Sequence, residues 1–197
     1  DSVTSIGSSA FDGCSGLTDV YYTGDLAGWM NIEFGDSDAN PTSYADNLYI
    51  DGELLEGEIV IPDGVTIIND YAFSGCSGLT SVTIGNGVTW WIGSYAFSGC
   101  SGLTSVTLGT GVTSIGSRAF DGCTGLTSVT IPDSVTSIGS QAFRGCTSLT
   151  IYCEAEGKPR YWSSGWNSNC PVVWDCNKTD IADDGYIYAI VDGVRYA

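Results

Sequence analysis

The chain lacks the side chain on which most nucleophilic catalysis depends. Its 197 residues include no histidine, so Ser-His and Cys-His nucleophile pairs and histidine metal clusters cannot form. Glycoside hydrolysis needs only two carboxylates, and candidates by residue type are Glu33, Asp36, Asp38, Glu154 and Glu156. No pattern in the sequence sets a pair of these at a defined separation. We therefore predict a protein without enzymatic activity or catalytic residues.

The sequence also lacks a recognisable pattern of metal ligands. Cys153, Cys170 and Cys176 match no standard zinc spacing, and a disulfide within this trio leaves one thiol over, with a connectivity that the sequence does not reveal. Calcium ligands are present by type in two groups, Asp36 with Asp38 and Asp180 with Asp183 and Asp184. Neither group fits an EF-hand loop. We predict no metal site and no cofactor.

Two sets of residues are candidates for binding. One is a set of serines and threonines at the non-core positions of three successive strands, expected to form a stripe along one face: Thr80, Ser81, Thr83, Thr104, Ser105, Thr107, Thr127, Ser128 and Thr130. The other is the pair Trp162 and Trp166, whose rings could stack on a sugar if they are exposed. Both sets also have a structural interpretation, the stripe as a solvated surface and the tryptophans as a cover over the core.

A short repeat positions the stripe. The pattern Ala-Phe-x-Gly-Cys occurs five times, at residues 10–14, 72–76, 96–100, 119–123 and 142–146. The last four phenylalanines are spaced by 24, 23 and 23 residues, a period typical of a solenoid. The extra residue lies at Trp90-Trp91.

One period predicts a strand, a turn, a second short extended piece and a single helical turn. Strands are indicated by Leu-x-x-Val-x-Ile runs such as Leu126 to Ile131. A serine or aspartate two residues before Ala-Phe, such as Ser94 or Asp70, is suited to cap the helical turn. The glycine of the pattern is suited to end the helical turn, because glycine readily adopts the left-handed conformation found there. We expect the phenylalanines and the pattern's five cysteines to point inward and stack from coil to coil.

The pattern Leu-x-x-Val-x-Ile-Pro-Asp-Ser-Val-Thr-Ser-Ile-Gly-Ser-x-Ala-Phe-x-Gly-Cys, at residues 126–146, resembles the 23-residue leucine-rich repeat of BspA-like bacterial and protist surface proteins. The resemblance covers residues 1–22 and about 58–153. It implies an α/β leucine-rich-repeat solenoid of the right-handed horseshoe type, β-rich with one-turn helices. It further implies an extracellular or cell-surface location and a role in adhesion or protein binding. The motif is a scaffold motif, so it carries no site residues.

We predict a single solenoid over residues 1–197, divided into four parts. Residues 1–22 form a partial first repeat, and the chain starts in mid-repeat, as a fragment of a longer protein would. Residues 23–57 form an insertion with a short helix around Trp29 and a hairpin at Asp51-Gly52. Regular repeats follow over 58–153. Residues 154–197 form an irregular aromatic tail that ends in a hairpin at Asp192-Gly193.

The charge narrows the choice of partner. Six basic against 23 acidic residues give a net charge of −17, which repels nucleic acids and anionic lipid. No apolar run is long enough to insert into a membrane. The predicted partner is an extracellular or host protein. The alternatives are a glycan, bound by exposed tryptophans and tyrosines, and no partner at all in a structural spacer.

Overall fold

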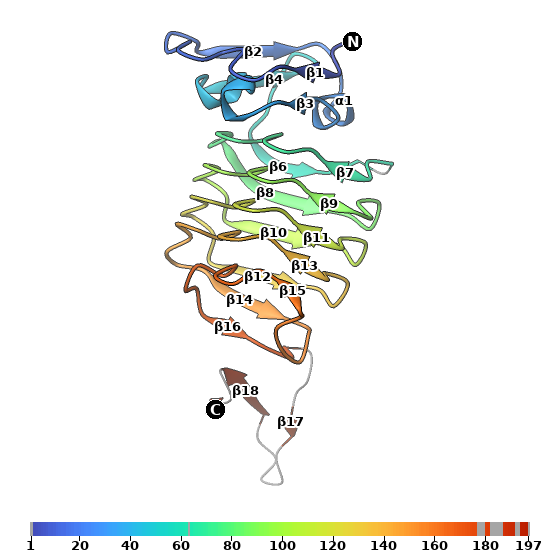
Figure 1. The fold of residues 1–197 in the computed structure, drawn as a ribbon, viewed down its shortest axis with the longest axis vertical. Coiled ribbons are helices and arrows are strands. Elements are labelled where there is room, and N and C mark those ends of the chain that lie inside the picture. The colour runs from blue at the N-terminus through green and yellow to red at the C-terminus, as the bar shows by residue number, and fades with distance from the viewer. Residues whose placement is uncertain (1, 63, 177–179, 182–186, 192–193, 197) are drawn as a thin grey trace.

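The computed structural model describes residues 2–62, 64–176, 180–181, 187–191 and 194–196. The chain winds into an elongated β-solenoid of stacked coils, with long strands along one side and short strands along the other (Figure 1). Every turn of a coil brings a strand beside its equivalent in the next coil. The helical content is low, and none of the described helices is long and apolar enough to cross a membrane.

Two series of strands build the solenoid. The long-strand side contains β2 (Asp19–Tyr22), β4 (Asn47–Ile50), β6 (Gly57–Val60), β8 (Leu79–Ile84), β10 (Ser105–Leu108), β12 (Ser128–Ile131), β14 (Thr150–Cys153) and β16 (Val172–Val173). The short-strand side contains β1 (Ser5–Ile6), β3 (Glu33–Phe34), β7 (Ile67–Ile68), β9 (Trp91–Ile92), β11 (Ser114–Ile115), β13 (Ser137–Ile138) and β15 (Tyr161–Trp162). Neighbours that form ladders within either series pair in parallel.

Among the described residues, antiparallel pairing occurs in two places. β5 (Glu53–Leu54) folds back on β4 as a hairpin around Asp51-Gly52. Near the C-terminus, β18 (Ile187–Val191) pairs with β16, β17 (Asp180–Ile181) and β19 (Val194–Tyr196). The residues expected to form the turn of the last hairpin, 192–193, lie outside the described residues.

The corners between short and long strands are turns, which corrects the expectation of one-turn helices. In the corner of residues 71–76, Ser74 N–H donates to the Tyr71 carbonyl within the turn, whereas Phe73 N–H donates to Ala96 of the next coil at 2.8 Å. A helix would direct these N–H groups to carbonyls of its own segment, whereas here Phe73 N–H bonds across to the next coil. Asp70 accordingly caps no helix, and its carboxylate accepts from Ser94 N–H in the neighbouring coil at 2.6 Å.

Two columns fill the core behind these corners. Phe73, Phe97, Phe120 and Phe143 stack with centroid spacings of 5.3, 5.4 and 5.5 Å and are all fully buried. Beside them, the thiols of Cys100, Cys123 and Cys146 each donate to a phenylalanine carbonyl of the preceding coil, at 3.1 to 3.2 Å. Cys14 was expected in this column, but it is exposed, because the first coil has a neighbour on one side only.

The segment 23–57 contains the expected helix and hairpin but also forms a coil of its own. The helical segments of the described chain all lie here: α1 (Leu26–Met30), η1 (Ser37–Ala39) and η2 (Pro41–Ser43). Between and after them, β3 pairs with β1 and β4 pairs with β2, both in parallel. Residues 23–50 therefore continue the stack as a degenerate repeat.

Side chains join this N-terminal part to the regular coils, because no ladder links β3 to β7 or β4 to β6. Trp29 Nε1 donates to the Ala72 carbonyl at 2.7 Å, and Asn40 Nδ2 donates to that of Tyr71 at 2.7 Å. Thr42 Oγ1 donates to the Ser74 carbonyl at 2.6 Å. Asn40 and Thr42 are both buried, so these bonds replace backbone pairing inside the core.

The solenoid also extends further toward the C-terminus than the sequence pattern indicates. β15 pairs with β13 and β16 with β14, both in parallel. Residues 154–173 thus form another coil, in place of the expected irregular tail. Trp162 takes the register position next to Ile138, and Trp166 contacts Phe143 at the end of the phenylalanine column.

Candidate binding surfaces

The predicted Ser/Thr stripe lies on the outer surface of the long-strand side. Seven of its nine residues are exposed and two, Ser81 and Thr83, are half-buried. The strand register aligns Ser81 with Ser105 and Thr83 with Thr107 across β8 and β10. The hydroxyl of Thr104 donates to the Thr80 carbonyl at 3.0 Å. The stripe is thus a regular row of short hydroxyl side chains.

Larger side chains flank this row, and the sequence analysis did not single them out as binding residues. Val60 is the register partner of Thr83 on one side, and Tyr152 is the partner of Thr130 on the other. Both are exposed, Val60 by 59% and Tyr152 by 37%. Each follows an inward residue by one position, Val60 after Ile59 and Tyr152 after Ile151, and their places beside the row follow from the strand register.

A stacked pair of tyrosines continues the outer surface of the N-terminal coils. The rings of Tyr21 and Tyr49 lie 4.5 Å apart at an angle of 13°, and the two residues are partners in the β2–β4 ladder. Tyr21 is 68% exposed. Such a pair offers an exposed aromatic face that is already ordered, the kind of surface that anchors protein partners.

Trp162 and Trp166 do not lie on the surface. Only 2% of Trp162 and 3% of Trp166 is exposed, and the two rings pack edge to face at 71° rather than coplanar. Trp162 Nε1 donates to the Val135 carbonyl at 3.1 Å. A buried indole cannot stack on a sugar, so these residues cover the core at its C-terminal end.

The exposed tryptophans of the described chain are Trp90 and Trp91, at the extra residue in the repeat. Trp91 is the register partner of Ile67, which is also partly exposed. A groove of about 330 Å³ lies where β3 and β7 do not pair. The residues that line it include Trp91, Ile67, Glu33, Asn69 and Asp70. The groove combines an indole face with two carboxylates and an amide.

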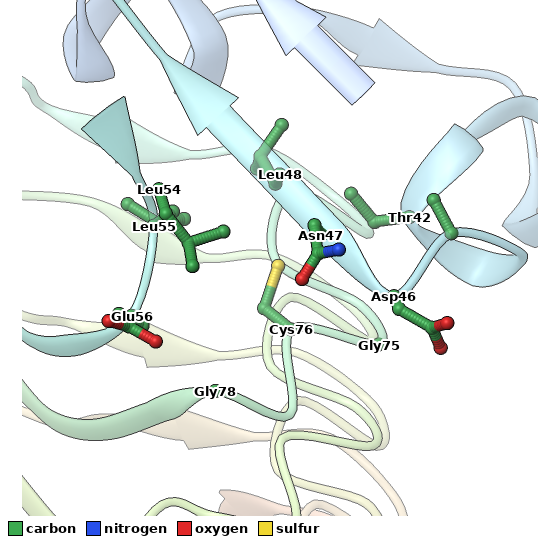
Figure 2. Close-up of a pocket in the computed structure, with 11 residues that line it drawn as sticks. Thr42, Asp46, Asn47, Leu48, Leu54, Leu55, Glu56, Gly75, Cys76 and Gly78 are labelled. Atoms are coloured by element: carbon green, nitrogen blue, oxygen red, sulfur yellow. The ribbon is translucent and has the colours of Figure 1, made fainter. Parts of the chain in front are cut away.

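A second depression lies where the β4–β5 hairpin meets the corner around Cys76. Figure 2 shows the Cys76 sulfur directed toward β4, with Leu48 and Asn47 above it and Leu55 to one side. Its volume is about 40 Å³, room for little more than a water molecule. Burial raises the pKa of the Cys76 thiol to about 12, so this thiol is not a nucleophile at neutral pH.

The candidate carboxylates act mainly as hydrogen-bond acceptors for the fold. Asp36 accepts from Ser9 N–H at 3.0 Å and Ala39 N–H at 2.8 Å, and the bond from Ser9 is the main cause that lowers its pKa. Asp38 accepts from the Tyr44 hydroxyl at 2.9 Å, and Glu154 from Asp133 N–H at 3.1 Å. Within the described residues, no group of three potential ligands could hold a metal ion. Asp183 and Asp184 lie outside them.

Comparison with known proteins gives one family and several solved structures. The family described as BspA type Leucine rich repeat region matches in six copies over residues 1–40 and 45–158. A leucine-rich cell surface protein from Faecalibacterium prausnitzii is 25% identical over 86% of this chain and 54% of its own, with a TM-score of 0.50. This chain thus spans about half the length of that protein.

A leucine-rich repeat protein from Bacteroides capillosus is 31% identical over 50% of this chain and 77% of its own, with a TM-score of 0.45. A leucine-rich repeat protein from T. pallidum is 26% identical over 60% of this chain and 69% of its own, with a TM-score of 0.41. No curated protein matches the sequence.

Proposed function

Because the chain belongs to the family of BspA-type leucine-rich-repeat proteins, we propose that it is a non-catalytic scaffold that recognises a protein partner outside the cell. The partner binds the outer surface of the long strands, the face that extends furthest along the stack. The observation that carries this proposal is the row in which Val60 and Tyr152 flank the Ser/Thr stripe.

Two kinds of residue in the row would contribute to binding in different ways. Tyr152 and Val60 supply the larger apolar area, and tyrosine is among the residues in which binding energy concentrates. The nine short hydroxyl residues between them keep the surface flat, and they can donate or accept hydrogen bonds along the partner. The net charge of −17 favours a partner whose docking surface is basic.

A cell-surface or secreted location fits the same proposal. The chain is 25% identical to the F. prausnitzii protein, which is described as a cell surface protein. We also propose that the solenoid bends in the right-handed horseshoe manner of leucine-rich repeats, with the degenerate coils of residues 23–50 and 154–173 on either side of the regular coils.

The test is binding of the fluorescently labelled 197-residue chain to an array of extracellular-matrix proteins and glycans, followed by titration of any protein hit. Tyr152→Ser and a bulky Thr107→Arg variant should each weaken binding to that protein about tenfold or more. Tyr161→Ser is the matched control, because Tyr161 is 71% exposed but lies on the short-strand side. Equal losses in Tyr161→Ser and Tyr152→Ser would contradict the proposed face.

One observation favours a glycan as the second candidate. The groove beside Trp91 offers an indole face for stacking on a sugar ring, and Glu33, Asn69 and Asp70 can accept or donate hydrogen bonds to its hydroxyls. Signal on glycan spots that Trp91→Ala removes, and that Tyr152→Ser leaves unchanged, would replace the protein-binding proposal with this one. Absence of signal on both kinds of spot would support a structural spacer.

A further inference from the structure

Two of the eight cysteines, Cys153 and Cys176, lie outside the corner positions of the coils. Cys170 extends the column of corner cysteines, because its thiol lies 3.5 Å from the Cys146 carbonyl and 3.9 Å from that of Phe143. Cys153 instead ends β14, in the register position that Ile131 holds in β12. Cys176 follows β16 and is half-buried. The odd thiol of the C-terminal trio is therefore Cys170, and Cys153 and Cys176 remain as a pair.

The backbone holds this pair together. Cys176 N–H donates to the Cys153 carbonyl at 3.0 Å, and Asp175 N–H donates to that of Ala155 at 2.9 Å. Standard bond lengths and this N···O distance keep the Cα atoms of Cys153 and Cys176 within about 7 Å of each other, and a disulfide spans Cα separations of about 4.4–6.8 Å.

We propose that Cys153 and Cys176 form a disulfide that fastens the C-terminal end of the solenoid. The oxidant is a small disulfide such as oxidised glutathione. The Cys176 thiolate attacks one of its sulfurs and expels one glutathione thiolate. The Cys153 thiolate then attacks the Cys176 sulfur and expels the second, so two protons leave the protein and two electrons pass to the oxidant.

The order of these steps follows from exposure. Cys176 is half-buried and can meet the oxidant, whereas Cys153 is fully buried. Burial, followed by the nearby Cys176, raises the pKa of the Cys153 thiol to about 12. Burial also raises the pKa of Cys176, and Glu154, Asp175 and Asp133 add to this effect. Ring closure in the folded chain should therefore be slow at neutral pH and become faster as the pH rises toward 10.

The bond would act beside a short ladder. β16 pairs with β14 through only two register pairs, Ile151 with Val172 and Tyr152 with Val173. A link from Cys153 to Cys176 closes the whole last coil into a loop, which lowers the conformational entropy of the unfolded chain. The last coil, with its three packed tryptophans, would then open less readily.

The experiment starts with the folded, reduced 197-residue chain in oxidised glutathione at pH 8.5. Thiols titrated in denaturant should fall from eight to six, with no glutathione left attached. Tryptic fragments 145–160 and 161–178 should be joined, and fragmentation should place the bond on Cys153 and Cys176. The midpoint of thermal unfolding should rise by about 5–10 °C.

Two variants test the assignment. Cys176→Ser changes a half-buried position and Cys153→Val keeps a buried one apolar, so at least one should fold as the parent does. Neither should form an intramolecular bond or show the thermal shift on oxidation. A bond between Cys146 and Cys170, a bond that persists in Cys176→Ser, or eight thiols after refolding in a redox buffer would overturn the proposal. An unchanged midpoint in the oxidised parent would overturn the fastening role.

Discussion

The Trp166 indole packs edge-on against the Phe143 ring, with centroids 6.2 Å apart and planes at 76°. In the column that leads to this contact, successive phenylalanine planes differ by 15° or less. A stacked ring can always accept another on its free face, whereas an edge-on indole presents no matching face. Trp162 and Trp174 pack around Trp166. The three indoles therefore cover the end of the phenylalanine column and shield it from solvent.

The phenylalanine column should carry much of the stability. Phe120 is fully buried between Phe97 and Phe143, and Phe120→Ala should lower the free energy of unfolding by about 3–5 kcal/mol, including the cavity it leaves. Urea unfolding followed by circular dichroism measures this. Phe11→Ala is the control: Phe11 holds the same repeat position but is only half-buried, so its loss should be clearly smaller. Similar losses in unfolding free energy for the two variants would contradict the stabilising role of the column.

The junction below the N-terminal coils should open before the regular coils do. Asn40 is fully buried, and its side chain joins the Tyr71 carbonyl to Thr42 N–H. Asn40→Ala leaves Thr42 N–H without its acceptor, at a cost of about 1–3 kcal/mol, whereas the Tyr71 carbonyl keeps its bond from Ser74 N–H. Native-state hydrogen exchange should then be faster in residues 19–50 than in 97–131. Asn86→Ala is the control, because its side-chain amide accepts from Thr110 in an exposed turn. This variant should leave the difference in exchange rate between the two segments as it is in the parent protein.

The regular coils were predictable because each local signal agreed with the next. The alternating Val and Ile positions became inward strand residues, and the phenylalanines formed the expected column. Seven of the nine residues of the Ser/Thr stripe are exposed, and binding at the stripe stays a prediction. The corners were predicted as helical turns because glycine and serine flank Ala-Phe, and these residues favour caps and tight turns alike. Hydrogen bonds to the neighbouring coil favour the turn over the helix. The sequence of a single repeat does not indicate such bonds.

The degenerate coils were missed because substitutions conceal their pattern. Phe34 and Leu48 each follow their register partners, Ile6 and Val20, by 28 residues, a spacing that a search at 23 overlooks. Trp166 follows Phe143 by 23 residues, but tryptophan replaces phenylalanine there. The exposed-tryptophan hypothesis failed for the same reason: residues outside a recognised repeat look free for binding until the stack is seen to enclose them.

Close packing of the coils should make some glycines irreplaceable. A Cβ at Gly116 would collide with the backbone of Gly93 and Ser94 in the preceding coil, whereas a Cβ at Gly85 would have nothing within 4 Å. Neither residue has positive φ. We expect Gly116→Ala to destabilise the protein by about 1–3 kcal/mol and Gly85→Ala to change it by less than about 0.5 kcal/mol. Thermal unfolding of both variants measures the difference, and two equal midpoints would refute the close approach.

Buried thiols should make the fold sensitive to alkali. Burial raises the pKa of Cys76 to about 12 and that of Cys100 well above its ordinary value. A thiol whose pKa is higher in the folded chain favours folding fully below the pKa of the unfolded chain, and this contribution is lost as the pH rises from about 9 toward 12.

The urea midpoint of the reduced protein should therefore be lower at pH 10.5 than at pH 8. Burial raises the pKa of Tyr22 and Tyr71 as well, so the wild type alone does not isolate the thiols. Cys76→Ala removes one thiol and keeps the tyrosines, and its free energy of unfolding should fall less between the two pH values, by up to about 1.4 kcal/mol per pH unit. An identical fall in both proteins would mean that Cys76 is already accessible to solvent in the folded chain, and that the pocket beside β4 opens readily.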